Sequence, residues 1–116
     1  SFGTEVILKH ALEHVEAGTV AGVVLLSPPL HRTSDAELAR WAAVDVPVVA
    51  LVPEHDDFLQ PEAAAARFAL APDVRVVPVA GAKHLWVGER YVRIVLDAIA
   101  DLVVPGSAPL PTHWPV

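Results

Sequence analysis

The sequence predicts an α/β fold, in which helices flank a parallel sheet. Segments with helical patterns and segments with strand-like patterns alternate along the 116 residues, which is typical of parallel strands joined by helical crossovers. The first strand-like segment, Val20–Leu26, is a continuous apolar run, as in strands that helices cover on both faces. Hydrophobic residues make up 53% of the chain, so a packed core is expected rather than disorder.

Four segments are predicted to be helices. In Thr4–Glu16 the apolar residues recur at helical spacing, and Gly18 is a suitable stop. Ser34–Val44 starts with Ser followed three residues later by Glu, the pattern of a capping box. Glu62–Leu70 is rich in alanine, the strongest helix former. Arg90–Val103 is amphipathic, with its apolar residues on one face.

Three apolar runs between these helices are predicted to be strands: Val20–Leu26, Pro47–Val52 and Val74–Val79. Each is bounded by turn or loop residues, as buried strands of parallel sheets are. Proline cannot donate to the ladder of a central strand, so Pro78 indicates that the end of the last run lies at an edge or is irregular.

We expect residues 1–104 to form one partial domain and Pro105–Val116 to form an extended, proline-rich tail in which Trp114 docks on the body. A sheet of three apolar strands would leave a long hydrophobic edge bare, which favours aggregation. We therefore expect more of the sheet to precede Ser1, so that the chain is the C-terminal half of a domain and the missing N-terminal half is a partner. The other interpretation is a small autonomous domain, complete as it stands.

Charge and composition exclude several kinds of partner and chemistry. The net charge of −6 repels nucleic acids and anionic membrane surfaces, so neither is an expected partner. The apolar runs are too short to cross a bilayer. The chain has no cysteine, which rules out a disulfide framework, thiolate metal ligands and a cysteine nucleophile. The lack of cysteine also fits a reducing, cytoplasmic location.

Polar residues follow the predicted strands at the end where open parallel sheets carry their sites. Asp56 and Asp57 follow the second strand, His84 follows the third, and Ser1 stands directly before the first helix. Acyl transfer by a serine needs a base to activate the hydroxyl and a carboxylate to orient the base. Ser1, then Asp56 or Asp57, then His84 is the chain order Ser, Asp, His of one known form of catalytic triad.

The same residues resemble motifs of the α/β-hydrolase family of serine hydrolases, in particular enzymes of the dienelactone hydrolase and esterase kind. Ser1–Gly3 resembles the last three positions of the nucleophile elbow G-x-S-x-G. Leu51–Phe58 resembles the family's strand followed by G-x-x-D-x-hydrophobic, with Pro53 where glycine is usual, and this alignment selects Asp56 as the acid. Residues 79–86 resemble the segment G-x-x-H-aromatic, with Leu85 where an aromatic residue is common.

The resemblance implies a hydrolase that cleaves an ester, thioester or amide bond of a small acyl substrate without a metal or organic cofactor. Ser1 would attack the carbonyl, His84 would act as general base and then acid, and Asp56 would orient the imidazole. The backbone N–H of Phe2 would be one oxyanion donor. The second donor belongs to a segment that this chain lacks. Because losing one donor lowers the rate about 10²–10³-fold, the isolated chain is expected to be nearly inactive.

Four further residues are predicted to line the substrate pocket: Pro28 and Pro29 after the first strand, and Leu85 and Trp86 beside His84. The whole segment Ser27–His31, which follows the first strand, would form a wall of this pocket or the entry to a cap, and the alternative is a rigid loop connection. For Leu85 and Trp86 the alternative is core packing. A different class of function is also open, because some proteins of this fold have no catalysis and act as binding or scaffold proteins.

The segment from His10 to His14 matches H-x-x-E-H, an inverted zinc-peptidase pattern in which Glu13 would be the base. The two histidines are four residues apart and could share a metal ion. No third ligand stands at a suitable place in the sequence, so a pair of histidines at the boundary of the helix is the favoured interpretation, and no metal is predicted.

Overall fold

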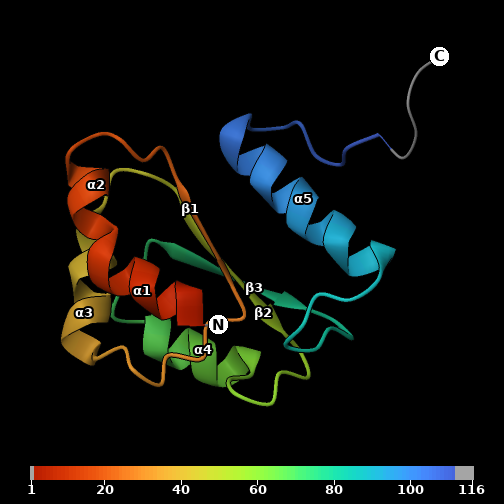
Figure 1. Ribbon diagram of the computed structural model, residues 1–116, viewed down its shortest axis with the longest axis horizontal. Helices are drawn as coiled ribbons and strands as arrows, with labels where there is room; N and C mark the ends of the chain where they lie inside the picture. The colour runs from red at the N-terminus through yellow and green to blue at the C-terminus, as the bar shows by residue number, and fades with distance from the viewer. Residues whose placement is uncertain (1, 112–116) are drawn as a thin grey trace. The chain divides into compact units, whose positions relative to one another are not determined.

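A computed structural model of the chain describes residues 2–111 (Figure 1). These residues fall in two compact units, one that ends at Leu85 and one that begins at Trp86. The first unit holds a three-stranded sheet with its helices, and the second holds one long helix and the segment that follows it. The division predicted from the sequence, into residues 1–104 and a tail, stays a prediction, and Trp114 lies outside the described residues.

The sheet is parallel throughout, which confirms the predicted fold class. It consists of β1 (Val23–Leu26), β2 (Val48–Pro53) and β3 (Val74–Val79) in the order β1-β2-β3. β2 is central and has a proline only at its last residue, Pro53, whereas β3, with Pro78 inside it, lies at an edge of this sheet, as Pro78 predicted. All three strands therefore end at the same edge, where the loops after them meet.

β1 is three residues shorter than predicted, because it begins at Val23 rather than Val20. The ladder starts where Val23 pairs with Val48, and the N–H of Val23 donates to the carbonyl of Pro47 at 3.0 Å. Pro47 has no N–H of its own, so the ladder cannot continue past it in this direction. Pro47 therefore lies outside β2 as well, although it was predicted to be the strand's first residue.

The helices lie where they were predicted, with two differences in detail. The first predicted helix is divided at Ala11, and the second ends in a turn of 3₁₀-helix. The observed helical elements are α1 (Phe2–His10), α2 (Leu12–Glu16), α3 (Asp35–Ala39), the 3₁₀-helix η1 (Arg40–Ala43), α4 (Pro61–Phe68) and α5 (Glu89–Val103).

Alternate strand residues point into one hydrophobic core that α1 to α4 and η1 cover. Val23 and Leu25 of β1 are buried in this core, whereas Val24 and Leu26, which alternate with them, are only half-buried. Successive strand residues face opposite sides of a sheet, so the core lies on one face. The helical residues of the core are Leu8, Leu12, Val15, Leu38, Trp41, Ala64 and Phe68.

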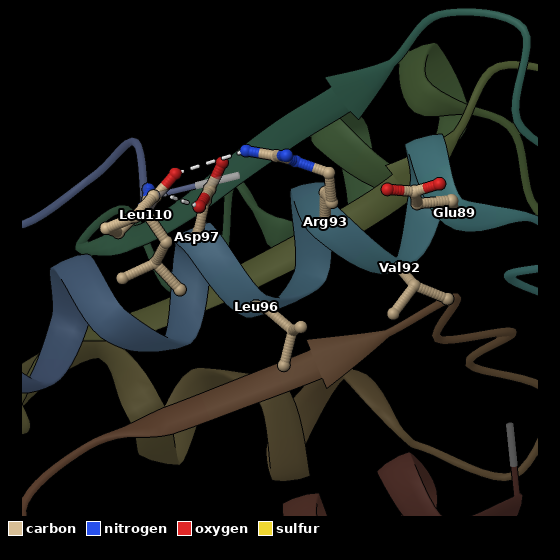
Figure 2. Close-up of a pocket in the computed structure, with 7 residues that line it drawn as sticks. Glu89, Val92, Arg93, Leu96, Asp97 and Leu110 are labelled. Atoms are coloured by element: carbon tan, nitrogen blue, oxygen red, sulfur yellow. Dashed lines mark hydrogen bonds between the residues drawn. The ribbon is translucent and has the colours of Figure 1, made fainter. Parts of the chain in front are cut away.

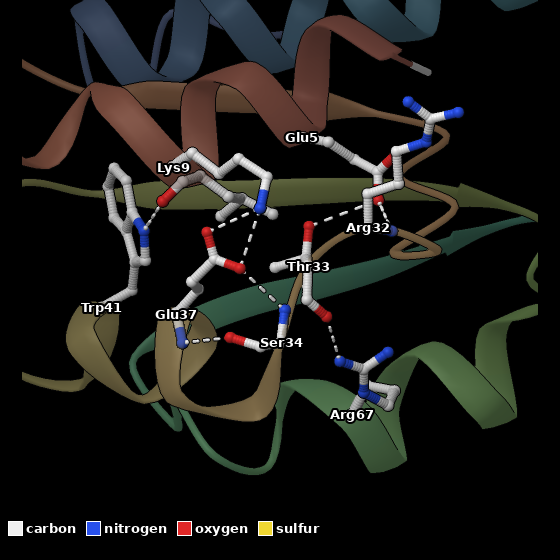
Figure 3. A network of polar contacts seen from close by, with 9 residues as sticks. Glu5, Lys9, Arg32, Thr33, Ser34, Glu37, Trp41 and Arg67 are labelled. Carbon is white, nitrogen blue, oxygen red and sulfur yellow. Dashed lines mark hydrogen bonds and ion pairs between the residues drawn. The ribbon is translucent and has the colours of Figure 1, made fainter.

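The N-terminus of α3 has the predicted capping box. The Ser34 hydroxyl accepts a hydrogen bond from the Glu37 N–H at 3.1 Å, and the Glu37 carboxylate accepts one from the Ser34 N–H at 3.0 Å. Lys9 of α1 donates to both oxygens of the same carboxylate, at 3.0 and 2.8 Å (Figure 3). Glu37 therefore joins the start of α3 to α1.

Glu37→Gln should make the protein less stable at neutral pH, by an amount that disappears in acid. The hydrogen bonds from Lys9 and then from the Ser34 N–H lower the pKa of Glu37 from 4.5 to about 2. A carboxyl group whose pKa is lowered by folding stabilises the folded state above its unfolded pKa, and this stabilisation is lost as the pH falls through the folded pKa. The difference in unfolding free energy between the two proteins should therefore shrink between pH 4.5 and about pH 2.

Urea titrations of both proteins across this range measure the effect. The introduced amide can still accept from the Ser34 N–H, so the comparison isolates the charge. Glu16→Gln, at an exposed position of α2, is the matched control. A difference that stays constant from pH 5 to pH 2 would show that the ion pair with Lys9 contributes nothing.

The second unit consists of α5 and the chain that returns along it. Arg93 donates to the carbonyl of Leu110 at 3.1 Å, and Asp97 accepts from the N–H of the same residue at 2.9 Å (Figure 2). A shallow hollow of about 280 Å³ lies between the helix and this segment. Within residues 2–111, no helix is both long enough and apolar enough to cross a membrane.

Candidate active site

Three polar residues, one from the loop after each strand, lie in contact at the carboxyl edge of the sheet. Ser27 follows β1, Asp56 lies in the loop after β2, and His84 lies in the loop after β3. Asp56 and His84 are in direct contact through their side chains, and Ser27 bonds to the main chain of His84. The edge that the sequence selected as the place for a site is therefore the edge where these residues gather.

Asp56 is buried and uses both of its carboxylate oxygens. Its Oδ2 lies 2.9 Å from Nδ1 of His84, and the side chain is 1% exposed. Its Oδ1 accepts hydrogen bonds from the backbone N–H groups of Phe58, at 2.8 Å, and Leu59, at 3.4 Å. A buried carboxylate needs such partners to remain charged. The two amide groups thus fix one oxygen and leave the other aimed at the imidazole.

His84 is held with its second nitrogen available for chemistry. An ionised carboxylate can only accept hydrogen bonds, so Nδ1 of His84 carries the proton that Asp56 Oδ2 accepts. Nε2 then keeps its lone pair and can act as a base. The side chain of His84 is 17% exposed, so the ring is mostly buried but still reachable. Asp57, the other acid considered from the sequence, is exposed.

Hydrogen bonds between the loops after β2 and β3 keep Asp56 and His84 in register. The N–H of Glu54 donates to the carbonyl of Val79 at 3.0 Å, and the N–H of His55 donates to that of Ala82 at 2.9 Å. The Glu54 carboxylate accepts from the N–H of Gly81 at 3.1 Å. Gly81 has a φ of 75°, a left-handed conformation that favours glycine. The pairing of the two strands therefore continues beyond the sheet as far as the site.

An aromatic ring lies against the imidazole of His84. The Phe58 ring centroid is 4.7 Å from that of His84, with 59° between the ring planes. The ring of His31 also contacts the Phe58 ring nearly edge-on. The two ring centroids are 5.7 Å apart, with 77° between the ring planes. Phe58 is 54% exposed, so it forms part of the surface beside the candidate base. From the sequence, Phe58 was only the hydrophobic position of a motif, and His31 was only one member of a segment predicted to wall a pocket or to open into a cap.

Ser27 is a second residue at the site whose contact the sequence did not reveal. Its hydroxyl donates to the backbone carbonyl of His84 at 2.9 Å, and the residue is 2% exposed. The sequence placed Ser27 correctly after a strand, which is the one available signal. The bond itself joins residues 57 positions apart, so no local pattern could indicate it.

The predicted nucleophile, Ser1, lies outside the described residues. Phe2, the predicted oxyanion donor, is the first residue of α1, and the first N–H groups of a helix have no acceptor within the helix. The buried carboxylate of Glu5 accepts hydrogen bonds from the N–H of Arg32 and, at 3.4 Å, from the hydroxyl of Thr33 (Figure 3). The first turns of α1 therefore lie against the loop that follows β1.

The four predicted pocket residues lie in different surroundings. Pro28 and Pro29 are buried in the loop after β1, and Leu85, next to His84 in the chain, is 71% exposed. Trp86 is half-buried and belongs to the second unit. The burial of the two prolines agrees with their alternative interpretation as a rigid connection, and their assignment to a pocket stays a prediction.

The H-x-x-E-H pattern forms no metal site in the part of the chain that the structure describes. His10 and His14 are exposed, and His14 Nε2 lies 3.5 Å from Glu13 Oε1. Among residues 2–111, no group of three or more His, Asp or Glu side chains could hold a metal ion.

No protein-family model and no curated protein matches this sequence. The fold is similar to the solved structure of an alpha-beta serine hydrolase homologue from Coxiella burnetii, with a TM-score of 0.66 and 20% sequence identity. The matched region covers 88% of this chain and 46% of that chain, so the chain spans about half the length of the matched structure. The parallel sheet flanked by helices thus matches part of the fold of that structure.

Proposed function

We propose that this chain carries the triad of a serine hydrolase that cleaves an ester, thioester or amide bond of a small acyl substrate. The observation that carries the proposal is the contact of 2.9 Å between His84 Nδ1 and the buried Asp56 Oδ2. The base of a Ser-His-Asp triad is held in the same way, with its Nδ1–H donated to a buried carboxylate. Ser1 is proposed as the nucleophile because it completes the order Ser, Asp, His.

In the proposed reaction, Nε2 of His84 removes the proton of the Ser1 hydroxyl as the oxygen attacks the substrate carbonyl. Asp56 stays ionised and stabilises the imidazolium that forms. The backbone N–H of Phe2 donates to the oxyanion of the tetrahedral intermediate. His84 then gives its proton to the leaving group, and water repeats the sequence to release the acid.

The position of α1 supports Ser1 in this role. Ser1 precedes α1 directly, and Glu5 in the same helix bonds to the loop after β1. That loop begins with Ser27, which bonds to the main chain of His84. The start of α1 and the candidate base are thus connected through one loop at one edge of the sheet.

These 116 residues alone are expected to hydrolyse esters slowly at most. The chain offers one oxyanion donor, Phe2, and one missing donor lowers the rate about 10²–10³-fold. Activity is therefore best measured on the natural polypeptide that contains this sequence. The narrower resemblance to dienelactone hydrolases and esterases stays a prediction.

Labelling of that natural polypeptide with a fluorophosphonate probe, followed by peptide mapping, tests the proposal. Such probes react with serines that a neighbouring base activates. The label is expected on Ser1, and it should be lost in Ser1→Ala and in heat-denatured protein, but not in the control Ser107→Ala. Absence of any label from the folded protein would contradict the proposal and would favour a binding or scaffold protein of the same fold.

A further inference from the structure

We infer that Ser27 is a positioning residue for the candidate base, whose hydroxyl fixes the main chain of His84 while Asp56 fixes its ring. This inference rests on the proposed function. The two constraints act on different atoms, because Ser27 Oγ donates to the carbonyl oxygen of His84 at 2.9 Å and Asp56 Oδ2 accepts from Nδ1. Together they determine where Nε2 points.

His84 needs such a second constraint because of where it lies. The segment after β3 contains turns and bends but no helix or strand until α5 begins. A hydrogen bond to Nδ1 alone leaves the backbone free to shift and to rotate the ring about that bond. A catalytic side chain has to be held within about 0.5 Å of its productive position, so a bond to the backbone carbonyl completes the support.

Ser27 is itself fixed at the end of β1. Its N–H donates to the carbonyl of Leu51 in β2 at 3.0 Å, which extends the ladder by one residue. The residue is 2% exposed. A buried hydroxyl without a partner is unfavourable, so the bond to His84 is a stable feature of this position rather than a chance contact on the surface.

The backbone conformation of Ser27 also supports a positioning role. Its φ is 50°, in the left-handed region where glycine fits without strain and other residues are uncommon. A connection that only had to turn the chain would be served better by glycine. Residues held in such conformations tend to occur at functional sites, and the side chain that serine retains here is the one that contacts His84.

The remainder of the loop is held from two sides, so Ser27 is a rigid support. Arg67 of α4 donates to the carbonyls of Leu30, at 3.2 Å, and Thr33, at 2.7 Å (Figure 3). Glu5 of α1 accepts from the N–H of Arg32. Helices α1 and α4 therefore both restrain the loop, and Ser27 in this restrained loop holds the main chain of His84 by its hydrogen bond.

Ser27→Gly in the natural polypeptide separates positioning from folding. Glycine relieves the strain at a φ of 50° and removes the small CH₂OH side chain, including the hydroxyl, so the variant should remain folded. We expect kcat for ester hydrolysis to fall about 10- to 100-fold, as for a small misplacement of a catalytic group, with KM unchanged. Ser27→Ala, which keeps the strained backbone, should lose at least as much of kcat.

Two controls make the outcome decisive. Thr19→Ala removes another hydroxyl that donates to a carbonyl, that of His14 at 3.0 Å, and should leave kcat unchanged. His84→Ala should abolish activity. If His84→Ala is inactive while Ser27→Gly has the kcat of the unmodified protein, the inference about Ser27 is overturned and the proposed function stands. If His84→Ala is fully active, the proposed function fails and the inference fails with it.

Discussion

Asp56→Asn in the natural polypeptide is expected to lower kcat for ester hydrolysis by about 10⁴-fold, the size of the loss that the same change produces in a serine protease with a Ser-His-Asp triad. The reason lies in the two oxygens of Asp56. The backbone N–H groups of Phe58 and Leu59 both donate to Oδ1, so the oxygen of the introduced amide will take that place. Its NH₂ group must then face His84.

The NH₂ group can only donate, so Nδ1 of His84 has to present its lone pair and the proton moves to Nε2. The nitrogen that should remove the proton of the nucleophile is then already protonated. The shape of the site changes little, because the amide has almost the same size as the carboxylate. The loss should therefore appear in kcat, with KM and the unfolding midpoint nearly unchanged.

Asp57→Asn is the matched control for this experiment. Asp57 is the next residue along the same loop and is exposed, and the identical substitution there should change kcat less than about two-fold, as expected for a surface site away from the reacting atoms. Equal losses in the two variants would show that the charge of the loop matters and the tautomer of His84 does not.

Trp41→Ala is expected to lower the unfolding free energy of the chain by about 3–5 kcal/mol, the usual range for removing a buried tryptophan. Trp41 is fully buried in the core shared by the helices and the sheet. Its ring nitrogen donates to the carbonyl of Leu8 at 3.0 Å, which joins η1 to α1 (Figure 3). A loss of this size is a large part of the about 5–15 kcal/mol that a typical domain has.

Urea denaturation followed by circular dichroism measures this loss. Trp41→Phe keeps an apolar ring and gives up the hydrogen bond to Leu8, so it should cost less than Trp41→Ala. Leu85→Ala, at a position that is 71% exposed, should change the unfolding free energy by less than about 0.5 kcal/mol. A Trp41→Ala variant as stable as Leu85→Ala would contradict the described core.

The fold class could be predicted from the sequence because strand-like, mostly apolar segments alternate with helical patterns, although Arg75 interrupts the last of these segments. The capping box at Ser34 was equally accessible, since two residues three positions apart define it. The start of β1 was not accessible from its own sequence. Val20 is as apolar as Val23, and the limit is set by Pro47, the residue directly before the neighbouring strand β2. Strand ends depend on partners that lie far away in the chain.

The candidate site also has some residues that could be predicted from the sequence and others that could not. Asp56 and His84 could be selected because the carboxyl ends of parallel strands meet at one edge, and the structure brings their side chains together. The choice of Asp56 over Asp57 needed the resemblance to a family motif. The ring contact of Phe58 and the hydroxyl of Ser27 could not be foreseen, because they depend on how three loops pack.

The most direct test of the account is nitrogen-edited proton NMR of His84 in the natural polypeptide, at a pH where the imidazole is neutral. We expect a single tautomer of His84, with the proton on Nδ1 and a far-downfield proton resonance from its bond to Asp56. This signal should disappear in Asp56→Asn and remain in Asp57→Asn. A ring that exchanges rapidly between both tautomers, with shifts that Asp56→Asn leaves unchanged, would contradict the account.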